Sequence, residues 1–249
     1  LVSFITSTVN ISGKTTLDCM STLELPYGDA ELVSVQSGMV DNVTPGLFID
    51  SRIEIQRNES RLVTQIVTAY GNELANLLDS DETRLSGNTL RPTSTICQDT
   101  DQDGIMEMPT VVPLPGYEEE EDVLYLTTFH RLGVGRTLVP TTSCVINEEN
   151  RYLLRLPESW IGTVTIVSQP ENNEWSFIRY NGTLEDSSSL LLRLKVYSVK
   201  DYHDRFESEY FELLGQQGLF EYYAHIPENA DPQLAITKEQ LNELFEFTN

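Results

Sequence analysis

The segment Ile96–Pro109 reads "ICQDTDQDGIMEMP" and places four carboxylates within nine residues. These carboxylates belong to Asp99, Asp101, Asp103 and Glu107. If the backbone curls, alternate acidic side chains point inward, and Gly104 supplies the positive φ that the turn needs. Hard oxygen ligands in this number suit calcium better than magnesium, which demands a tighter octahedral geometry. We therefore predict a structural calcium site whose ligands are Asp99, Asp101, Asp103, the backbone carbonyl of Ile105, and Glu107.

Charge repulsion supports a bound cation at this segment. Two carboxylates about 4 Å apart repel by roughly 4 kcal/mol at an effective dielectric constant near 20. The summed repulsion among four converging carboxylates is therefore comparable to the roughly 5–15 kcal/mol free energy of unfolding of a whole domain. The alternative is a solvated acidic turn whose side chains never converge. A catalytic metal is not expected, because it needs a nucleophile or base beside it, and the histidines His130, His203 and His225 are scattered along the chain.

The loop is not an EF-hand, which needs a bidentate Glu at its twelfth position and a helix on each side. The twelfth position here is Thr110, and both flanks are typical of strands. The pattern D-x-D-x-D-G-x-x-E between strands resembles the calcium loops of FG-GAP/VCBS-type β-propeller blades. Such loops usually end in Asp, where this chain has Glu107. Because one such loop is present, the resemblance implies a partial, propeller-blade-like array.

Charge and hydropathy narrow the range of partners. The chain carries 39 acidic and 16 basic residues, a formal charge of −23. Such a field repels phosphate backbones and anionic lipid, so we expect no nucleic-acid partner. No apolar run approaches the roughly 20 residues of a transmembrane helix. The sequence begins at Leu1 without Met, which leaves room for a lipid anchor upstream. A simpler interpretation is an acidic protein kept soluble by self-repulsion.

The cysteines and the known catalytic motifs give no sign of an enzyme. Cys19, Cys97 and Cys144 form no C-x-x-C pair, and buried free thiols or one disulfide both stay open. Cys144 with His130 could form a thiol nucleophile and base, but the apolar run "TTSCVI" indicates a buried thiol. The sequence contains no nucleophile elbow, metalloprotease helix, P-loop or dinucleotide fingerprint. We expect a protein without catalytic activity.

Strand-like segments rich in Val, Ile, Thr, Tyr and Phe dominate the first half. They are Leu1–Val9, Ala30–Gly38, Gly46–Gln56, Leu62–Gly71, Thr93–Gln98 and Met106–Leu114. In Leu62–Tyr70 the alternation predicts a strand with both faces partly covered. Glu73–Leu85 fits either a turn of helix or a strand and loop. Pro113–Val123, with its prolines and consecutive acids, predicts a boundary or a long exposed loop.

The second half predicts a sheet closed by a helix. The expected strands lie in residues 124–132, 137–146, 151–169, 174–182 and 189–199. Tyr210–Pro227 predicts a hairpin with the four-residue loop Gly215–Gly218, and Ser198–Glu209 a short helix or loop. Thr237 and Gln240 have capping-box spacing before an apolar helix face. The predicted fold class is mainly β with α+β, with a β-rich region at residues 1–141 and an antiparallel-sheet α+β domain at residues 142–249.

The motifs "YLLRLPESWIGTVTI", "EWSFIRY", "LLLRLKVYS" and "YFELLGQQGLFEYYAHIP" carry a second resemblance. They are similar to the C-terminal domain of secreted or lipoprotein-type proteins of Gram-positive gut Firmicutes, and "GLFIDS" and "CQDTDQDGIMEMP" resemble the region that precedes it. The resemblance spans residues 147–247 and implies a Mog1/PsbP-like α+β sandwich. It also implies an extracellular or cell-surface location rather than a particular activity.

We carry three functional hypotheses. The first is a non-catalytic, secreted or surface-anchored protein with a structural calcium ion, which binds a protein or polymer of unknown identity. The second is a carbohydrate-binding module, which requires an exposed row of Trp or Tyr. We predict instead that Trp160 and Trp175 pack in the core, and that His225 is a partly buried residue whose hydrogen bonds are satisfied. The third is an acidic hydrolase with carboxylates about 5 or 6.5–9.5 Å apart.

Overall fold

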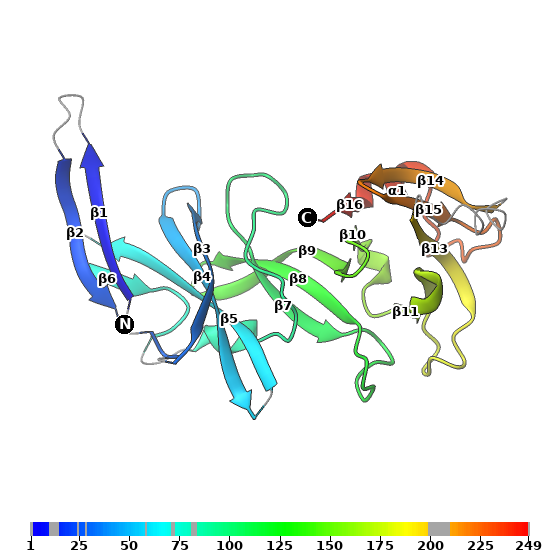
Figure 1. Ribbon diagram of the computed structural model, residues 1–249, viewed down its shortest axis with the longest axis horizontal. Helices are drawn as coiled ribbons and strands as arrows, with labels where there is room; N and C mark the ends of the chain where they lie inside the picture. The colour runs from blue at the N-terminus through cyan, green and yellow to red at the C-terminus, as the bar shows by residue number, and fades with distance from the viewer. Residues whose placement is uncertain are drawn as a thin grey trace. The chain divides into compact units, whose positions relative to one another are not determined.

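The protein is mainly β, as predicted, with one α-helix in the described part. The computed structural model describes the backbone of residues 2–9, 15–23, 25–27, 29–57, 59–70, 73–80, 84–198 and 210–248, and side chains from residue 25 onward within these ranges. Strands form a two-stranded hairpin and three larger, open antiparallel sheets (Figure 1). The helix or loop predicted for Ser198–Glu209 lies outside the described residues after Ser198, as does His203.

The chain divides into two compact units. The first comprises Leu1–Val111 and Thr128–Thr142, and the second Val112–Thr127 and Ser143–Asn249. Whether residues 1–141 and 142–249 are domains that fold independently stays a prediction, as do their propeller-blade-like and Mog1/PsbP-like assignments. In the ranges that the structure describes, no helix has the length and apolar character needed to span a membrane.

The first unit is built on a four-stranded antiparallel sheet with the order β3-β4-β5-β6. Its strands are β3 (Glu31–Met39), β4 (Pro45–Gln56), β5 (Glu59–Tyr70) and β6 (Glu73–Asn76), and β1 (Val2–Val9) and β2 (Thr15–Leu23) form a separate hairpin. Every side chain from Leu62 to Thr68 in β5 is buried. The prediction of a strand covered on both faces is therefore confirmed.

One face of this sheet carries the first hydrophobic core. Its buried members are Val40, Phe48, Ile66, Leu77, Leu78, Cys97, Met106 and Met108. Gly38 in β3 lets the segment after the acidic loop approach closely, since a Cβ on Gly38 would lie 2.1 Å from Met106 Cγ. Any other residue at this position would force the Met106 side chain to move.

A buried ion pair lies against the same face of the sheet. Arg91 Nη2 lies 2.7 Å from Asp50 Oδ1, and both side chains are fully buried. The Thr64 hydroxyl donates to Asp50 at 2.6 Å, and the Cys97 N–H donates to its other carboxylate oxygen at 3.0 Å. Arg91 also donates to the Thr89 carbonyl at 2.9 Å. This network satisfies the buried charges, which would otherwise be strongly destabilising.

The prediction of a strand at Thr93–Gln98 is wrong. In this segment only Gln98 forms a bridge, which pairs it with Glu107. Side chains satisfy its backbone instead: Arg91 Nε donates to the Thr95 carbonyl at 2.6 Å and Gln36 Nε2 to the Cys97 carbonyl at 2.6 Å. In Glu73–Leu85 the described residues form a strand at Glu73–Asn76 followed by turn and bridge residues, and a 3₁₀ helix begins at Leu85 and ends at Thr89. Residues 81–83 lie outside the described part.

The core of the second unit lies between strands of two five-stranded sheets, with the orders β16-β10-β9-β8-β7 and β11-β12-β13-β15-β14. Residues 108–111 and 128–142 of the first of these sheets belong to the first unit. The first sheet contains β7 (Met108–Pro113), β8 (Tyr125–Gly133), β9 (Thr137–Asn147), β10 (Tyr152–Arg155) and β16 (Phe245–Phe247); the second sheet contains β11 (Val164–Gln169), β12 (Glu174–Arg179), β13 (Ser189–Ser198), β14 (Glu212–Gln217) and β15 (Phe220–His225). Trp160 and Trp175 are buried in this core, which confirms their predicted packing role. Short 3₁₀ helices occur at Glu158–Trp160 and Pro170–Asn172.

The closing helix α1 (Lys238–Leu244) begins as predicted. The Gln240 N–H donates to the Thr237 hydroxyl at 3.2 Å, and the Thr237 N–H donates to the Gln240 side chain at 2.8 Å, which completes a capping box. Leu241 faces the core.

The hairpin before the helix exists, but the prediction of its four-residue loop is wrong. Gln217 pairs with Phe220, so the turn is Gly218–Leu219, and Gly218 has a φ of +59°. Gly215 lies inside β14, where an added Cβ would lie 2.8 Å from the Phe247 ring. The sequence rule that glycine marks a turn therefore holds for Gly218 and fails for Gly215.

Replacing Arg91 with Met should lower the free energy of unfolding by about 3–5 kcal/mol, because Asp50 would stay buried and charged without its partner. Urea denaturation followed by circular dichroism measures this change. As a matched control, Arg61→Met removes an arginine whose partner, Glu59, is partly exposed, and it should cost no more than about 1 kcal/mol. Equal effects of the two substitutions would contradict a structural role for the buried pair.

Candidate functional site: the acidic loop

The acidic loop, residues 99–107, is closed at its base by backbone pairing. Gln98 and Glu107 exchange two backbone hydrogen bonds of 3.1 and 2.9 Å. Just beyond Ile105, the Met106 N–H donates to the Met39 carbonyl at 2.9 Å, which ties the loop to β3. Gly104 has a φ of +88°, as its predicted role requires. The loop is therefore a fixed turn of the first unit.

The carboxylates of the loop curl inward onto its own backbone. Asp99 accepts hydrogen bonds from the N–H groups of Asp103 at 3.1 Å and Gly104 at 2.9 Å. Asp103 accepts one from the Ile105 N–H at 2.9 Å. Glu107 is fully buried and accepts hydrogen bonds from both the N–H and the hydroxyl of Thr100 at 2.8 Å. The side chains of Asp99, Asp103 and Glu107 thus turn towards the loop, while residues 101–104 are exposed to solvent.

Three of the five predicted ligands meet in a way that could hold a metal ion. Oxygen atoms of Asp99, Asp101 and Glu107 all lie within 4.8 Å of one another. Calcium–oxygen bonds measure about 2.3–2.6 Å, so two oxygens on opposite sides of one ion lie about 5 Å apart. The spacing therefore fits a single ion. Asp103 and the Ile105 carbonyl do not belong to this group, and their roles as ligands stay predictions.

Arg131, on β8, is a member of the site that the sequence did not indicate. Its Nη2 atom lies 2.6 Å from Asp101 Oδ2 and 2.8 Å from Asp103 Oδ2, and its Nε donates to Glu107 Oε1 at 3.3 Å. Burial lowers the pKa of Arg131, but the charges of Asp101 and Asp103 and the hydrogen bonds to Glu107 and Asp101 outweigh this effect and raise it. The loop therefore contains one internal cation against four carboxylates.

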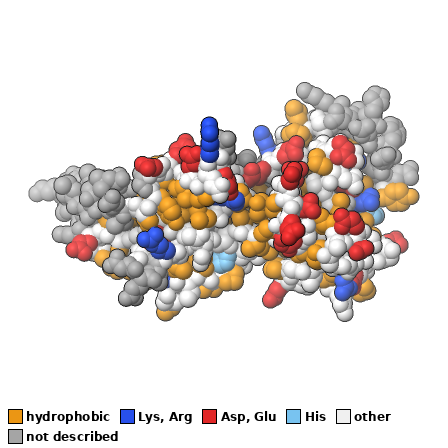
Figure 2. Space-filling model, turned by 90° about the horizontal axis from the view of Figure 1, so that it is seen from below, with side chains coloured by type: hydrophobic (Ala, Val, Ile, Leu, Met, Phe, Trp, Pro, Cys, Tyr) orange, Lys and Arg blue, Asp and Glu red, His pale blue; other side chains and the backbone are white. Residues whose placement is uncertain are grey.

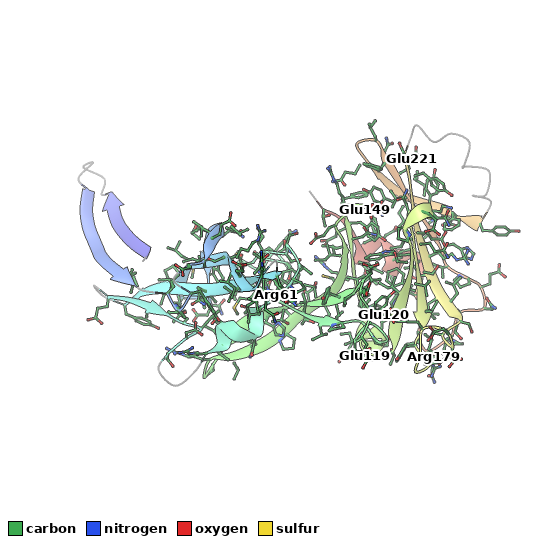
Figure 3. The ribbon with its side chains drawn as sticks, turned by 60° about the horizontal axis from the view of Figure 1, so that its bottom comes forward. Arg61, Glu119, Glu120, Glu149, Arg179 and Glu221 are labelled. Atoms are coloured by element: carbon green, nitrogen blue, oxygen red, sulfur yellow. The ribbon has the colours of Figure 1, made fainter. Side chains whose placement is uncertain are left out.

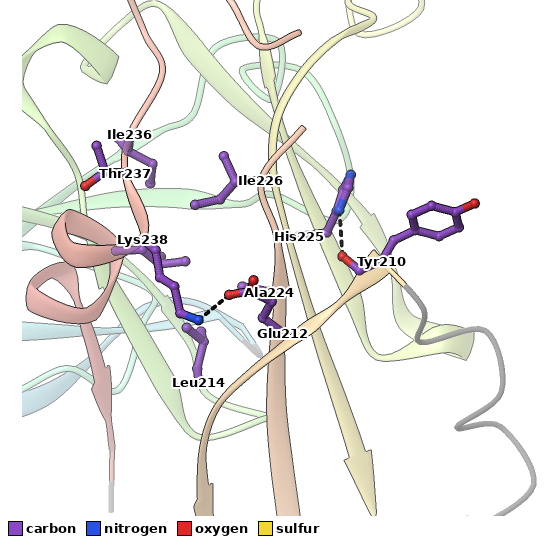
Figure 4. Close-up of a pocket in the computed structure, with 10 residues that line it drawn as sticks. Tyr210, Glu212, Leu214, Ala224, His225, Ile226, Ile236, Thr237 and Lys238 are labelled. Atoms are coloured by element: carbon purple, nitrogen blue, oxygen red, sulfur yellow. Dashed lines mark hydrogen bonds and ion pairs between the residues drawn. The ribbon is translucent and has the colours of Figure 1, made fainter. Parts of the chain in front are cut away.

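A pocket of about 290 Å³ lies in the second unit between the β14–β15 hairpin and the start of α1 (Figure 4). Its apolar wall includes Leu214, Ile226 and Ile236. Its charged groups, Glu212 and Lys238, form an ion pair with each other. His225 Nδ1 donates to the Tyr210 carbonyl at 2.8 Å, because a carbonyl can only accept. The polar groups of the pocket are thus mostly paired internally, and His225 is the satisfied, half-buried residue that was predicted.

The carbohydrate-binding and hydrolase hypotheses stay predictions. The pocket holds a single carboxylate, Glu212, whereas a glycosidase needs two. Acidic side chains are spread over the face shown in Figure 2 rather than gathered in one depression. Among the described residues, the strongly exposed Tyr side chains are Tyr70 and Tyr210, which belong to different units and form no row.

The thiols that the structure describes are buried and free. Cys97 and Cys144 form no disulfide, and Cys19 lies among the residues whose side chains are not described. Burial raises the pKa of Cys144 to about 12 and that of Cys97 well above its ordinary value. Both thiols therefore stay protonated at neutral pH, and neither has the low pKa of a nucleophilic cysteine.

The Cys144 thiol should make the protein less stable in alkali. The unfolded chain loses this proton above about pH 9, whereas the folded protein keeps it until about pH 12, so the folded state binds more protons and stability falls as pH rises. When the pH rises from 8 to 10, the free energy of unfolding should fall in both proteins. The fall should be about 1 kcal/mol smaller in Cys144→Ala than in the unchanged protein. Urea denaturation at the two pH values measures the difference. Parallel losses in both proteins would show that Cys144 does not titrate as proposed.

No family model, curated protein or solved structure matches this chain. The FG-GAP/VCBS-type and Mog1/PsbP-like resemblances therefore stay predictions.

Proposed function

We propose that the chain is a non-catalytic, secreted or surface-anchored protein in which the acidic loop binds calcium as a structural ion. The observation that carries the proposal is the convergence of Asp99, Asp101 and Glu107 oxygens within 4.8 Å. All three donors are carboxylate oxygens, which favours a hard cation, and calcium tolerates the irregular geometry of such a turn. The ion would stiffen the connection between the segment 93–98 and β7.

The surroundings of the loop favour a weak site. Asp101 is exposed, so solvent screens part of its charge, and Arg131 already neutralises one negative charge. Calcium sites of low affinity, with Kd values of about 10⁻⁴–10⁻³ M, are typical of extracellular modules. Such a site fills only where calcium is millimolar. This expected affinity, together with the resemblance to secreted and lipoprotein-type proteins of Gram-positive gut bacteria, supports the proposed location.

We further propose that the sheets carry the partner-binding role, with a protein or polymer as the ligand. The formal charge of −23 favours partners that are neutral or basic, since like charges across an interface repel. The pocket between the β14–β15 hairpin and α1 offers such a partner one small recess with an apolar wall.

Calcium should bind to the purified protein with a Kd of about 10⁻⁴–10⁻³ M, as measured by isothermal titration calorimetry. At one hundred times Kd it should raise the free energy of unfolding by about 2.7 kcal/mol relative to EDTA. Asp99→Asn combined with Asp101→Asn should abolish the heat of binding and the stabilisation, since it removes two of the three converging carboxylates.

A matched control removes two charges elsewhere. Glu119 and Glu120 lie in the exposed loop between β7 and β8 (Figure 3), and Glu119→Gln with Glu120→Gln should leave calcium binding unchanged. If the unaltered protein shows no heat and the same melting curve in calcium and EDTA, the calcium proposal is wrong. If both double variants lose binding equally, the site lies outside the acidic loop.

A further inference from the structure

Arg131 reaches the acidic loop from a different part of the chain. It lies on β8, 24 residues after Glu107, and its guanidinium contacts carboxylates of Asp101, Asp103 and Glu107. The Glu107 side chain is fully buried, and that of Arg131 is 32% exposed. The guanidinium is therefore a cation that these carboxylates already bind, supplied by the protein itself and held by charge-assisted hydrogen bonds.

Two of the carboxylates that Arg131 contacts belong to the group that could hold a metal ion. Arg131 contacts Asp101 Oδ2 and Glu107 Oε1, and both residues belong to the three-carboxylate group. The remaining Glu107 oxygen is held by Thr100, and both Asp99 oxygens accept backbone N–H groups. A divalent ion among these oxygens would lie beside the positive guanidinium, and the two cations would repel each other strongly in this partly buried place.

We propose that Arg131 is the internal counter-ion of the acidic loop, and that Arg131 and a divalent cation are mutually exclusive occupants of its carboxylates. This inference rests on the proposed function for its metal-bound state. Without metal, Arg131 holds the loop against β8. When the ion binds, the loop carboxylates turn to the metal, and Arg131 is released. The negative charge of the loop is therefore partly compensated in both states, and metal binding is coupled to the attachment of the loop to β8.

The test compares Arg131→Gln with Arg136→Gln. Arg136 is an exposed residue in the turn between β8 and β9, so its substitution removes the same charge from the same hairpin without touching the loop. In EDTA, Arg131→Gln should melt at a lower temperature than the unaltered protein. Its calcium Kd, measured by calorimetry, should be at least about tenfold lower, because the ion no longer displaces a guanidinium. Arg136→Gln should change neither value.

A direct readout follows Arg131 itself. In the unaltered protein, calcium should shift the NMR signal of the Arg131 Nε–H group, assigned by its loss in Arg131→Gln, towards the position of a solvated arginine. Calcium affinity that is unchanged or weaker in Arg131→Gln overturns the exclusion, because Arg131 would then be neutral or supportive. Arg131→Lys, which keeps the charge but not the planar fork, should fall between the two proteins and serves as the second variant if Arg131→Gln does not fold.

The two proposals fail separately. If no variant binds calcium, the calcium site is wrong, and the melting temperatures in EDTA still decide whether Arg131 is the counter-ion of the loop. If calcium binds but Arg131→Gln melts like the unaltered protein in EDTA, the counter-ion role is wrong and the calcium site stands.

Discussion

A carboxylate inside a protein needs a cation or several hydrogen-bond donors beside it, and the first unit is organised around two such groups. Asp50 and Glu107 are both fully buried. Asp50 is compensated by Arg91 and Thr64, and Glu107 by Thr100 and Arg131. An uncompensated charge at either position would cost several kcal/mol. The need to compensate these two charges therefore brings Arg91 to Asp50 and Arg131 to Glu107.

The two buried carboxylates explain how a long irregular connection stays ordered. Between β6 and β7 the chain contains a 3₁₀ helix and isolated bridges rather than long strands. Asp50 binds Arg91 and the backbone at Cys97, which fixes the middle of this connection against β4. Glu107 binds Thr100 across the acidic loop and fixes its end. Charge compensation thus takes the place that a β-ladder occupies elsewhere in the protein.

The second unit depends on apolar packing instead. Tyr152 lies at the centre of an aromatic cluster, with ring centroids 5.6 Å from Trp175, 6.1 Å from Tyr222 and 5.5 Å from Phe245. Such edge and stacked contacts add about 0.5–1.5 kcal/mol each to the burial of the rings. A buried carboxylate occurs in this unit too: Glu174 lies 3.5 Å from Arg193 Nε and 3.9 Å from Lys195 Nζ. A metal ion at Asp99, Asp101 and Glu107 would bind to residues of the first unit.

Local patterns in the sequence were enough to predict β5, the capped helix and the acidic turn. The alternation in Leu62–Thr68, the Thr237–Gln240 spacing and the position of Gly104 each depend on residues a few positions apart. Only the tertiary structure decided that Arg131 enters the loop, that Arg91 pairs with Asp50, and that Thr93–Gln98 is not a strand. The partners in these ion pairs lie 24 to 41 residues apart. No local spacing encodes such pairs, because they form only where the folded chain brings a buried negative charge and a cation together.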